Sequence, residues 1–349
     1  MPRSLIVGLA GTSLRSSEQR FLTATQPAGV ILFRRNIETR AQVKRLTEDV
    51  RSAIGADCLI LVDEEGGRVQ RLRPPAGRLL PAAARHGETY QDNPGLACDV
   101  AKLIARLTAH DLREIGINTN CAPVADLRFP GAHDIVGDRA YGNEIDAVVT
   151  LAGAVASGLS AGGVLPVLKH IPGHGRARCD SHHALPVVDA PHEALSKTDF
   201  APFNALNAWP AAMTAHVVYS AIDSHAPATI SATIICDVVR GEIGFDGLLM
   251  TDDLSMKALR GTLPERAASA LSAGCDIALH CNGKLHEMEA VAEVCGPMSG
   301  VSVARFKTAF GTTKKIAGFD QNAAMECLAK VLAGTHVTSE QLSRLDPTA

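Results

Sequence analysis

Eight apolar runs of strand length recur along the chain, each followed by a longer segment, and this alternation constrains the fold more than any other feature. The runs are SLIVGLAG, AGVILF, CLILVD, INTNCAPV, GVLPVLKH, AAMTAHVV, GLLMTDD and CDIALHCN. Strands that are hydrophobic nearly throughout and alternate with helices are typical of a parallel sheet covered on both faces. Eight such units favour an α/β fold with a single (β/α)8 barrel of the TIM type, and an open doubly wound sheet is the alternative.

The segments between the runs carry helical spacing of apolar residues. One set is Val43, Leu46, Val50 and Ile54, and the other is Leu96, Val100, Leu103, Leu107 and Ile115. Because glycine often follows the last turn of a helix, we predict that these helices end at Gly55 and Gly116. A further helix is predicted from about Asn322.

The chain shows no linker rich in Pro, Ser or Gly, so we predict one catalytic domain over 1–349 with a tail that frays from about 335. A net charge of −3 without charge clusters gives no electrostatic reason to expect nucleic acid or a membrane surface. We therefore expect a small-molecule partner and a monomer. Nine cysteines without a CxxC pair indicate reduced thiols and a cytoplasmic protein.

Polar residues interrupt the apolar runs repeatedly at their C-terminal ends. They are Asp63, Lys169, His170, His216, Asp252 and Asn282. A single such residue has an ordinary structural explanation, since a strand-end Asp often caps the next helix. In a parallel barrel, however, all these ends lie on one face, which carries the chemistry. Five strands with polar ends therefore predict a functional mouth.

The stretch LKHIPGHGRARCDSHHALP, from Leu168 to Pro186, concentrates histidines. A helical metal site is not supported, because Pro172 and Gly173 separate His170 from His174. A phosphate loop lacks its Lys-Ser or Lys-Thr signature. In an extended loop, residues two apart project to the same side, so Asp180 can orient the imidazole of His182 as an acid/base pair. On these residues alone, a solvated loop is the commoner explanation.

Four motifs occur in order: DEEGGRVQR, KHIPGHG, DSH and LLMTDDLSM. With them, the chain resembles the N-acetyl-β-glucosaminidases of glycoside hydrolase family 3. The resemblance implies a TIM-type barrel without a metal or cofactor, as in the short Gram-negative members that recycle peptidoglycan in the cytoplasm. It implies exo-acting, retaining release of N-acetylglucosamine from muropeptides such as GlcNAc-1,6-anhydro-MurNAc-peptides. Ile171 departs from the usual Phe, and NTNCAPV from NFAPV-like wording.

The resemblance also assigns roles to residues. The nucleophile falls on Asp252, with Asp253 pointing elsewhere, and the acid/base dyad falls on Asp180 and His182. The sugar-binding positions are Asp63, Arg71, Arg139, Lys169 and His170.

Cleavage of a glycosidic bond requires a proton donor for the leaving oxygen and a carboxylate on the opposite face of the sugar. Asp252 can supply the second, and Lys169 and Arg139 would favour its ionised form. Four alternatives stay open: attack by the substrate's own acetamido group, phosphorolysis on the same site, a metal-dependent hydrolase using the histidines of 170–183, and a silent carbohydrate-binding barrel.

Overall fold

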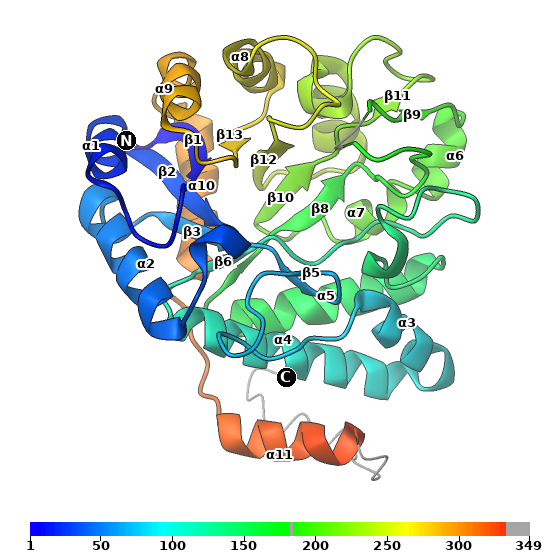
Figure 1. Cartoon of the computed structure of the whole chain (residues 1–349). Helices are drawn as coiled ribbons and strands as arrows, with labels where there is room; N and C mark the ends of the chain where they lie inside the picture. The colour runs from blue at the N-terminus through cyan, green and yellow to red at the C-terminus, as the bar shows by residue number, and fades with distance from the viewer. Residues whose placement is uncertain (182–183, 333–349) are drawn as a thin grey trace.

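Nine strands form one parallel sheet in the computed structural model, which describes residues 1–181 and 184–332 (Figure 1). They are β1 (Arg3–Gly8), β2 (Pro27–Leu32), β3 (Leu59–Val62), β6 (Thr119–Asn120), β7 (Leu165–Pro166), β8 (Leu168–Ile171), β10 (Ala211–Thr214), β12 (Leu248–Asp253) and β13 (Ile277–His280). Their order across the sheet is β7-β6-β3-β2-β1-β13-β12-β10-β8. Each lies within one of the eight apolar runs or extends one residue beyond it, and β7 and β8 are two parts of the fifth.

The sheet closes on itself because β7 and β8 follow each other in the chain. β7 pairs with β6, and β8 pairs with β10 at the other end of the order. Between the two halves, the Val167 N–H donates to the carbonyls of Asn120 and Ala122, each at 3.0 Å. The predicted (β/α)8 barrel is confirmed, and the open doubly wound sheet is wrong.

Helices surround the barrel in chain order. They are α1 (Ser16–Thr25), α2 (Arg40–Ile54), α3 (Ala83–Asp92), α4 (Pro94–Glu114), α5 (Ile145–Ala161), α6 (His192–Lys197), α7 (Ala201–Ala205), a π-helix (Ile234–Glu242), α8 (Leu263–Ala273), α9 (Leu285–Val294), α10 (Gly300–Thr312) and α11 (Gln321–Leu332). The predicted stops are confirmed: Gly55 and Gly116 follow α2 and α4 with φ of 116° and 81°, where a side chain would be strained. The predicted C-terminal helix is α11.

Two apolar layers hold the barrel together, and the alternation of strand side chains creates both. Along β1, Ile6 points into the barrel interior with Leu279 of β13, whereas Leu5 and Val7 pack outward under the helices. All three side chains are fully buried. Because successive residues of a strand face opposite sides, a run hydrophobic at every position fills both layers.

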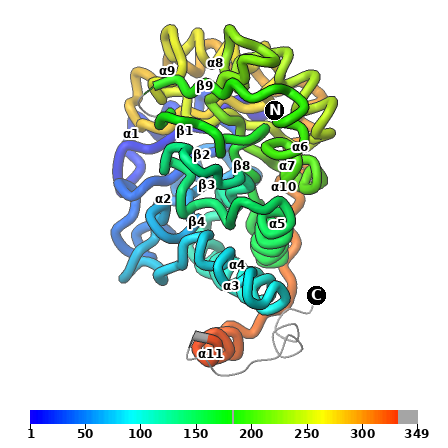
Figure 2. Tube along the Cα trace, turned by 90° about the vertical axis from the view of Figure 1, so that its right-hand side faces the viewer, coloured from blue at the N-terminus to red at the C-terminus, as the bar shows by residue number. Residues whose placement is uncertain are grey.

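α10 covers the N-terminal end of the barrel. Its Phe306 and Phe310 rings stack with centroids 6.0 Å apart and belong to the interior cluster together with Met298. α11 lies outside the barrel and packs on α4 through Ala324 and Cys327 (Figures 1 and 2). The predicted fraying from about 335 falls outside the described residues.

Two short pairs of strands, one antiparallel and one parallel, lie outside the barrel sheet and were not predicted. β4 (Glu64–Gly66) and β5 (Val69–Gln70) form an antiparallel hairpin directly after β3. β9 (Val187–Val188) pairs in parallel with β11 (Val218–Tyr219) beyond the loop that carries the DSH motif. All nine cysteines are free thiols. Among the described residues, no helix is long and apolar enough to cross a membrane.

Candidate active site

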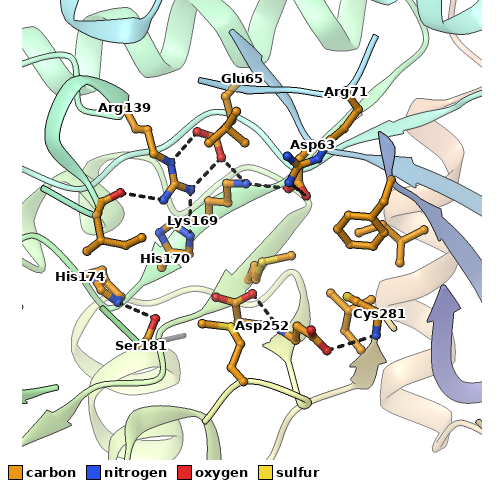
Figure 3. A pocket seen from close by; sticks show the side chains of 18 of the residues that line it. Asp63, Glu65, Arg71, Arg139, Lys169, His170, His174, Ser181, Asp252 and Cys281 are labelled. Atoms are coloured by element: carbon orange, nitrogen blue, oxygen red, sulfur yellow. Dashed lines mark hydrogen bonds and ion pairs between the residues drawn. The ribbon is translucent and has the colours of Figure 1, made fainter. Parts of the chain in front are cut away.

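A cavity of about 360 Å³ opens at the C-terminal ends of the strands (Figure 3). Its lining residues come from the barrel strands, the β4–β5 hairpin and the segments that follow β2, β3, β5, β6, β8, β12 and β13. The charged and polar ones include Asp63, Glu65, Arg68, Arg71, Arg139, Lys169, His170, His174, Ser181, Asp252 and Asp253. The predicted mouth therefore exists, and it contains every predicted sugar-binding residue.

Lys169, the second residue of β8, is the centre of a buried ion-pair network. Its Nζ lies 2.9 Å from Oδ1 of Asp63 and 2.6 Å from Oε1 of Glu65, and its side chain is 3% exposed. Arg71, the residue directly after β5, binds the other carboxylate oxygen of Asp63 at 3.0 Å. Burial alone would raise the pKa of Asp63, but Lys169 and Arg71 outweigh it and hold that pKa well below its usual range.

Arg139 completes the network from the loop after β6. Its Nε and Nη2 atoms donate to the two carboxylate oxygens of Glu65, each at 2.8 Å, a bidentate pair. Burial would raise the pKa of Glu65, yet Arg139 and Lys169 lower it to about 2. Three cations thus share two carboxylates, and the excess positive charge faces the cavity.

His170 is oriented by a residue that the sequence did not single out. Asp126, fully buried, lies 2.7 Å from the His170 Nδ1 and accepts from the His174 backbone N–H at 2.6 Å. Since Nδ1 donates to this carboxylate, Nε2 is free to accept, and the Arg139 Nη2 lies 3.5 Å from it. The buried carboxylate of Asp126 therefore fixes the tautomer of His170, with the proton on Nδ1.

Asp252 is the penultimate residue of β12, and its side chain reaches the cavity from a different side than the Lys169 network (Figure 3). Its Oδ1 accepts from the Asp253 backbone N–H at 2.8 Å. Burial would raise its pKa, but His216, His170, that N–H and Lys169 outweigh burial, so the pKa of Asp252 is lowered. Lys169 was expected to favour the ionised form of Asp252, and it does lower this pKa, but His216 and His170 lower it more. Arg139 was expected to do the same but pairs with Glu65 instead.

Asp253 follows Asp252 but has a different role. Its carboxylate accepts from the Ser255 N–H and the Cys281 N–H, at 3.0 and 3.1 Å, and so ties the end of β12 to the end of β13. Asp253 borders the cavity, but these bonds occupy its carboxylate.

Two of the predicted strand-end residues do not line the cavity. His216 is buried behind Asp252, between the Thr229 hydroxyl at 2.7 Å and the Asp253 carbonyl at 3.0 Å. Asn282 donates its side-chain amide to Glu287, the third residue of α9, so this strand end is tied to the helix that follows it. The expectation that both would point into the mouth is wrong, because local partners were available to each.

The loop with the DSH motif reaches the cavity at Ser181, which is 3% exposed and lines it. Asp180 precedes it and is partly exposed. His182 lies outside the described residues. Within the described ranges, no group of three or more His, Cys, Asp or Glu residues could hold a metal ion.

Three functional residues escaped sequence reasoning: Glu65, Asp126 and His174. Glu65 stands in the quoted motif DEEGG, and alternation along β4 could have placed it beside Asp63. Asp126 carried no local signal, since its partners lie 44 and 48 residues later. His174 was weighed as a metal ligand, whereas burial and the nearby His170 lower its pKa to about 4, so its ring is neutral.

The geometry can now be compared with known proteins. Residues 5–310 match the glycosyl hydrolase family 3 N-terminal domain. The chain belongs to glycosyl hydrolase family 3. It is therefore a glycoside hydrolase. A β-hexosaminidase of Bordetella avium is 39% identical over 285 residues, 80% of this chain and 81% of that protein. One of Thioalkalivibrio sulfidiphilus is 39% identical over 311 residues, 88% of each.

A solved structure extends this likeness to the fold. NagZ of Neisseria gonorrhoeae, in complex with N-trifluoroacetyl-D-glucosamine, superimposes with a TM-score of 0.85 at 31% identity, over 95% of this chain and 98% of that chain. The glycoside hydrolase and the TIM-type barrel expected from the sequence are thereby confirmed.

Proposed function

We propose that this chain is a retaining, exo-acting β-N-acetylglucosaminidase whose nucleophile is Asp252. The observation that carries the proposal is the strand-end carboxylate of Asp252, ionised and set in a cavity whose opposite wall is the Lys169 network. The β-hexosaminidase relatives and the ligand of the gonococcal structure support N-acetylglucosamine as the sugar. A cavity of about 360 Å³ lies at the small end of ligand sites, which suits one terminal sugar ring.

Each wall of the cavity has a distinct task in this mechanism. The network of Asp63, Lys169 and Arg139 offers charged donors and acceptors to sugar hydroxyls, and these partners hold the ring in one orientation. Asp252 attacks the anomeric carbon as the bond to the leaving oxygen breaks, and a glycosyl ester forms. Water then releases the sugar with net retention, because configuration is inverted twice.

The proton for the leaving oxygen comes, in this proposal, from His182 paired with Asp180. A histidine with pKa of ~6.5 can donate in the first step and accept from water in the second at neutral pH. As natural substrate we propose muropeptides such as GlcNAc-1,6-anhydro-MurNAc-peptides, cleaved by a cytoplasmic monomer during peptidoglycan recycling. The family resemblance and the reduced cysteines support this setting.

An assay on three 4-nitrophenyl glycosides tests the proposal. We expect turnover of the N-acetyl-β-glucosaminide at least ~100-fold faster, in kcat/KM, than of the β-glucoside or the β-xyloside, since the acetamido group adds contacts in the transition state. Release of the product as the β-anomer, followed by NMR, tests retention. Equal turnover of all three substrates or initial release of the α-anomer would contradict the proposal.

Replacement of His182 by Ala is expected to lower kcat/KM by ~100-fold for an alkyl N-acetyl-β-glucosaminide. The same change should alter kcat/KM for the 2,4-dinitrophenyl substrate by less than ~3-fold, because its leaving group needs no proton. Asp180→Ala should give the same pattern more weakly, through a misoriented imidazole. Steady-state kinetics on the two substrates measures both effects, and an equal loss on both substrates would remove His182 from the acid role.

A further inference from the structure

The loop between Gly175 and Pro186 is fastened at its two ends. At the first end, the Arg176 Nε donates to Asp199 at 2.7 Å, and its guanidinium lies over the Phe129 ring at 3.9 Å. At the other end, the Val218 N–H donates to the Pro186 carbonyl at 2.9 Å. Of the described residues between these points, Arg178 and Ala184 are exposed and Cys179 and Asp180 are partly exposed, whereas Ala177 is buried beside Arg176.

Ser181 breaks this pattern of exposure. It is 3% exposed although Cys179, Asp180 and Ala184 are exposed or partly exposed, and it borders the cavity. A small polar residue gains little from burial itself, so a buried serine at such a place indicates a specific contact.

Ser181 makes two contacts, one with each side of the mouth. Its Oγ lies 3.4 Å from Nε2 of His174, on the barrel side (Figure 3). Its carbonyl accepts from the Ala258 N–H at 3.1 Å, in the loop that follows β12. That second loop also carries Met256, which lines the cavity beside Asp252. Ser181 thus fastens its own loop to His174, after β8, and to the loop that follows the strand of the nucleophile, β12.

The His174 end of this contact is itself held rigidly. The His174 backbone N–H donates to the buried Asp126 at 2.6 Å, and its ring packs against His170 with centroids 5.6 Å apart. Burial lowers the pKa of His174 to about 4, so the ring is neutral near pH 7 and keeps one ring nitrogen without a proton. A neutral imidazole can accept from or donate to a hydroxyl, and either direction holds the loop.

We propose that Ser181 is a positioning residue for the acid/base step: its contacts with His174 and Ala258 fix the distance between the DSH loop and the anomeric centre. The inference rests on the proposed function, which assigns the acid/base roles to the two neighbours of Ser181. A proton donor must come within hydrogen-bond reach of the leaving oxygen, so a small displacement of the loop slows protonation and leaves nucleophilic attack intact.

The test is Ser181→Ala, with kcat/KM measured on an alkyl and a 2,4-dinitrophenyl N-acetyl-β-glucosaminide. We expect a loss of about 10-fold on the alkyl substrate and less than ~2-fold on the activated one, since only the former needs the proton. Ser181→Cys, which restores a weak donor of similar size, is expected to recover part of the loss. Cys179→Ala, in the same loop, should leave both values within ~2-fold of wild type.

A loss of equal size on both substrates, or no loss on either, overturns the role of Ser181, because a general loosening of the fold would not discriminate between leaving groups. His182→Ala on the same substrates separates the two failures. If His182→Ala loses kcat/KM mainly on the alkyl substrate but Ser181→Ala does not, only the role of Ser181 is contradicted. If neither variant shows a larger loss on the alkyl substrate, the assignment of His182 as the acid/base is contradicted as well.

Discussion

Replacement of Asp252 by Ala is expected to lower kcat for N-acetyl-β-glucosaminides by about 10⁴-fold or more, because no other carboxylate can take over the attack. Among the described residues, Asp63 and Glu65 are held by Lys169, and Asp253 is bonded to Ser255 and Cys281. Binding of N-acetylglucosamine should change little, since the Lys169 network is untouched. Stopped-assay kinetics and calorimetric titration measure the two quantities.

A trapping experiment identifies the nucleophile independently. A 5-fluoro N-acetyl-β-glucosaminyl fluoride slows both chemical steps, while its good leaving group restores the first, so a glycosyl ester accumulates. Peptide mass spectrometry should locate the ester on Asp252. An ester on Asp253, or no ester together with inhibition by a thiazoline analogue, would transfer the attack to the neighbour or to the acetamido group.

Replacement of Lys169 by Met is expected to lower the free energy of unfolding by about 3–5 kcal/mol, because two buried carboxylates lose a shared cation. The same change should reduce kcat/KM by ~10³-fold, because Asp63 and Glu65 lose the cation that positions them for the sugar and Asp252 loses a nearby positive charge. Denaturant titration and kinetics check both effects. Lys197→Met is the matched control: Lys197 also pairs with a carboxylate, Glu193, but is 71% exposed, so we expect a change below ~0.5 kcal/mol.

The instability of Lys169→Met should itself depend on pH. In the wild type, Asp63 and Glu65 have pKa values below those of the unfolded chain, so their pairing stabilises the fold above the unfolded pKa of ~4 and this contribution is lost as the pH falls toward about 2. Without Lys169, only Arg71 opposes the effect of burial on Asp63 and only Arg139 opposes it on Glu65, so both pKa values rise above those of the wild type and protonation of the two carboxylates costs less. The difference in melting temperature between variant and wild type should therefore shrink from pH 7 to pH 4. A constant difference would mean that the lysine acts through packing alone.

The barrel was predictable because the information that specifies it is local. Ile6 and Val7 need only be apolar in succession for β1 to fill both the interior and the outer layer. The same reasoning placed Asp63, Lys169 and Asp252 on one face, because parallel strands end together. The stops at Gly55 and Gly116 followed from backbone freedom, which is a property of the residue itself.

The parts that escaped prediction depend on partners distant in sequence. Asp126 matters through His170 and His174, and nothing near it announces them. Asn282 was wrongly predicted to point into the cavity for the opposite reason: its partner is close in sequence, since its amide donates to Glu287, five residues later. The β4–β5 hairpin consists of strands of three and two residues, too short to be recognised as a hairpin from the sequence, although it carries Glu65 and leads into Arg71.

The stacked Phe306 and Phe310 of α10 affect how substrate enters the cavity and how products leave it. In the described part of the chain, these rings and the interior cluster occupy the barrel axis below the cavity, so substrate and products share one opening. In the proposed mechanism, the aglycone lies nearest that opening and departs first, which gives water its path to the glycosyl ester. The freed sugar then leaves last and, while it stays, blocks the next substrate. We therefore predict competitive product inhibition by N-acetylglucosamine, with a strength set by how tightly the Lys169 network holds its ring.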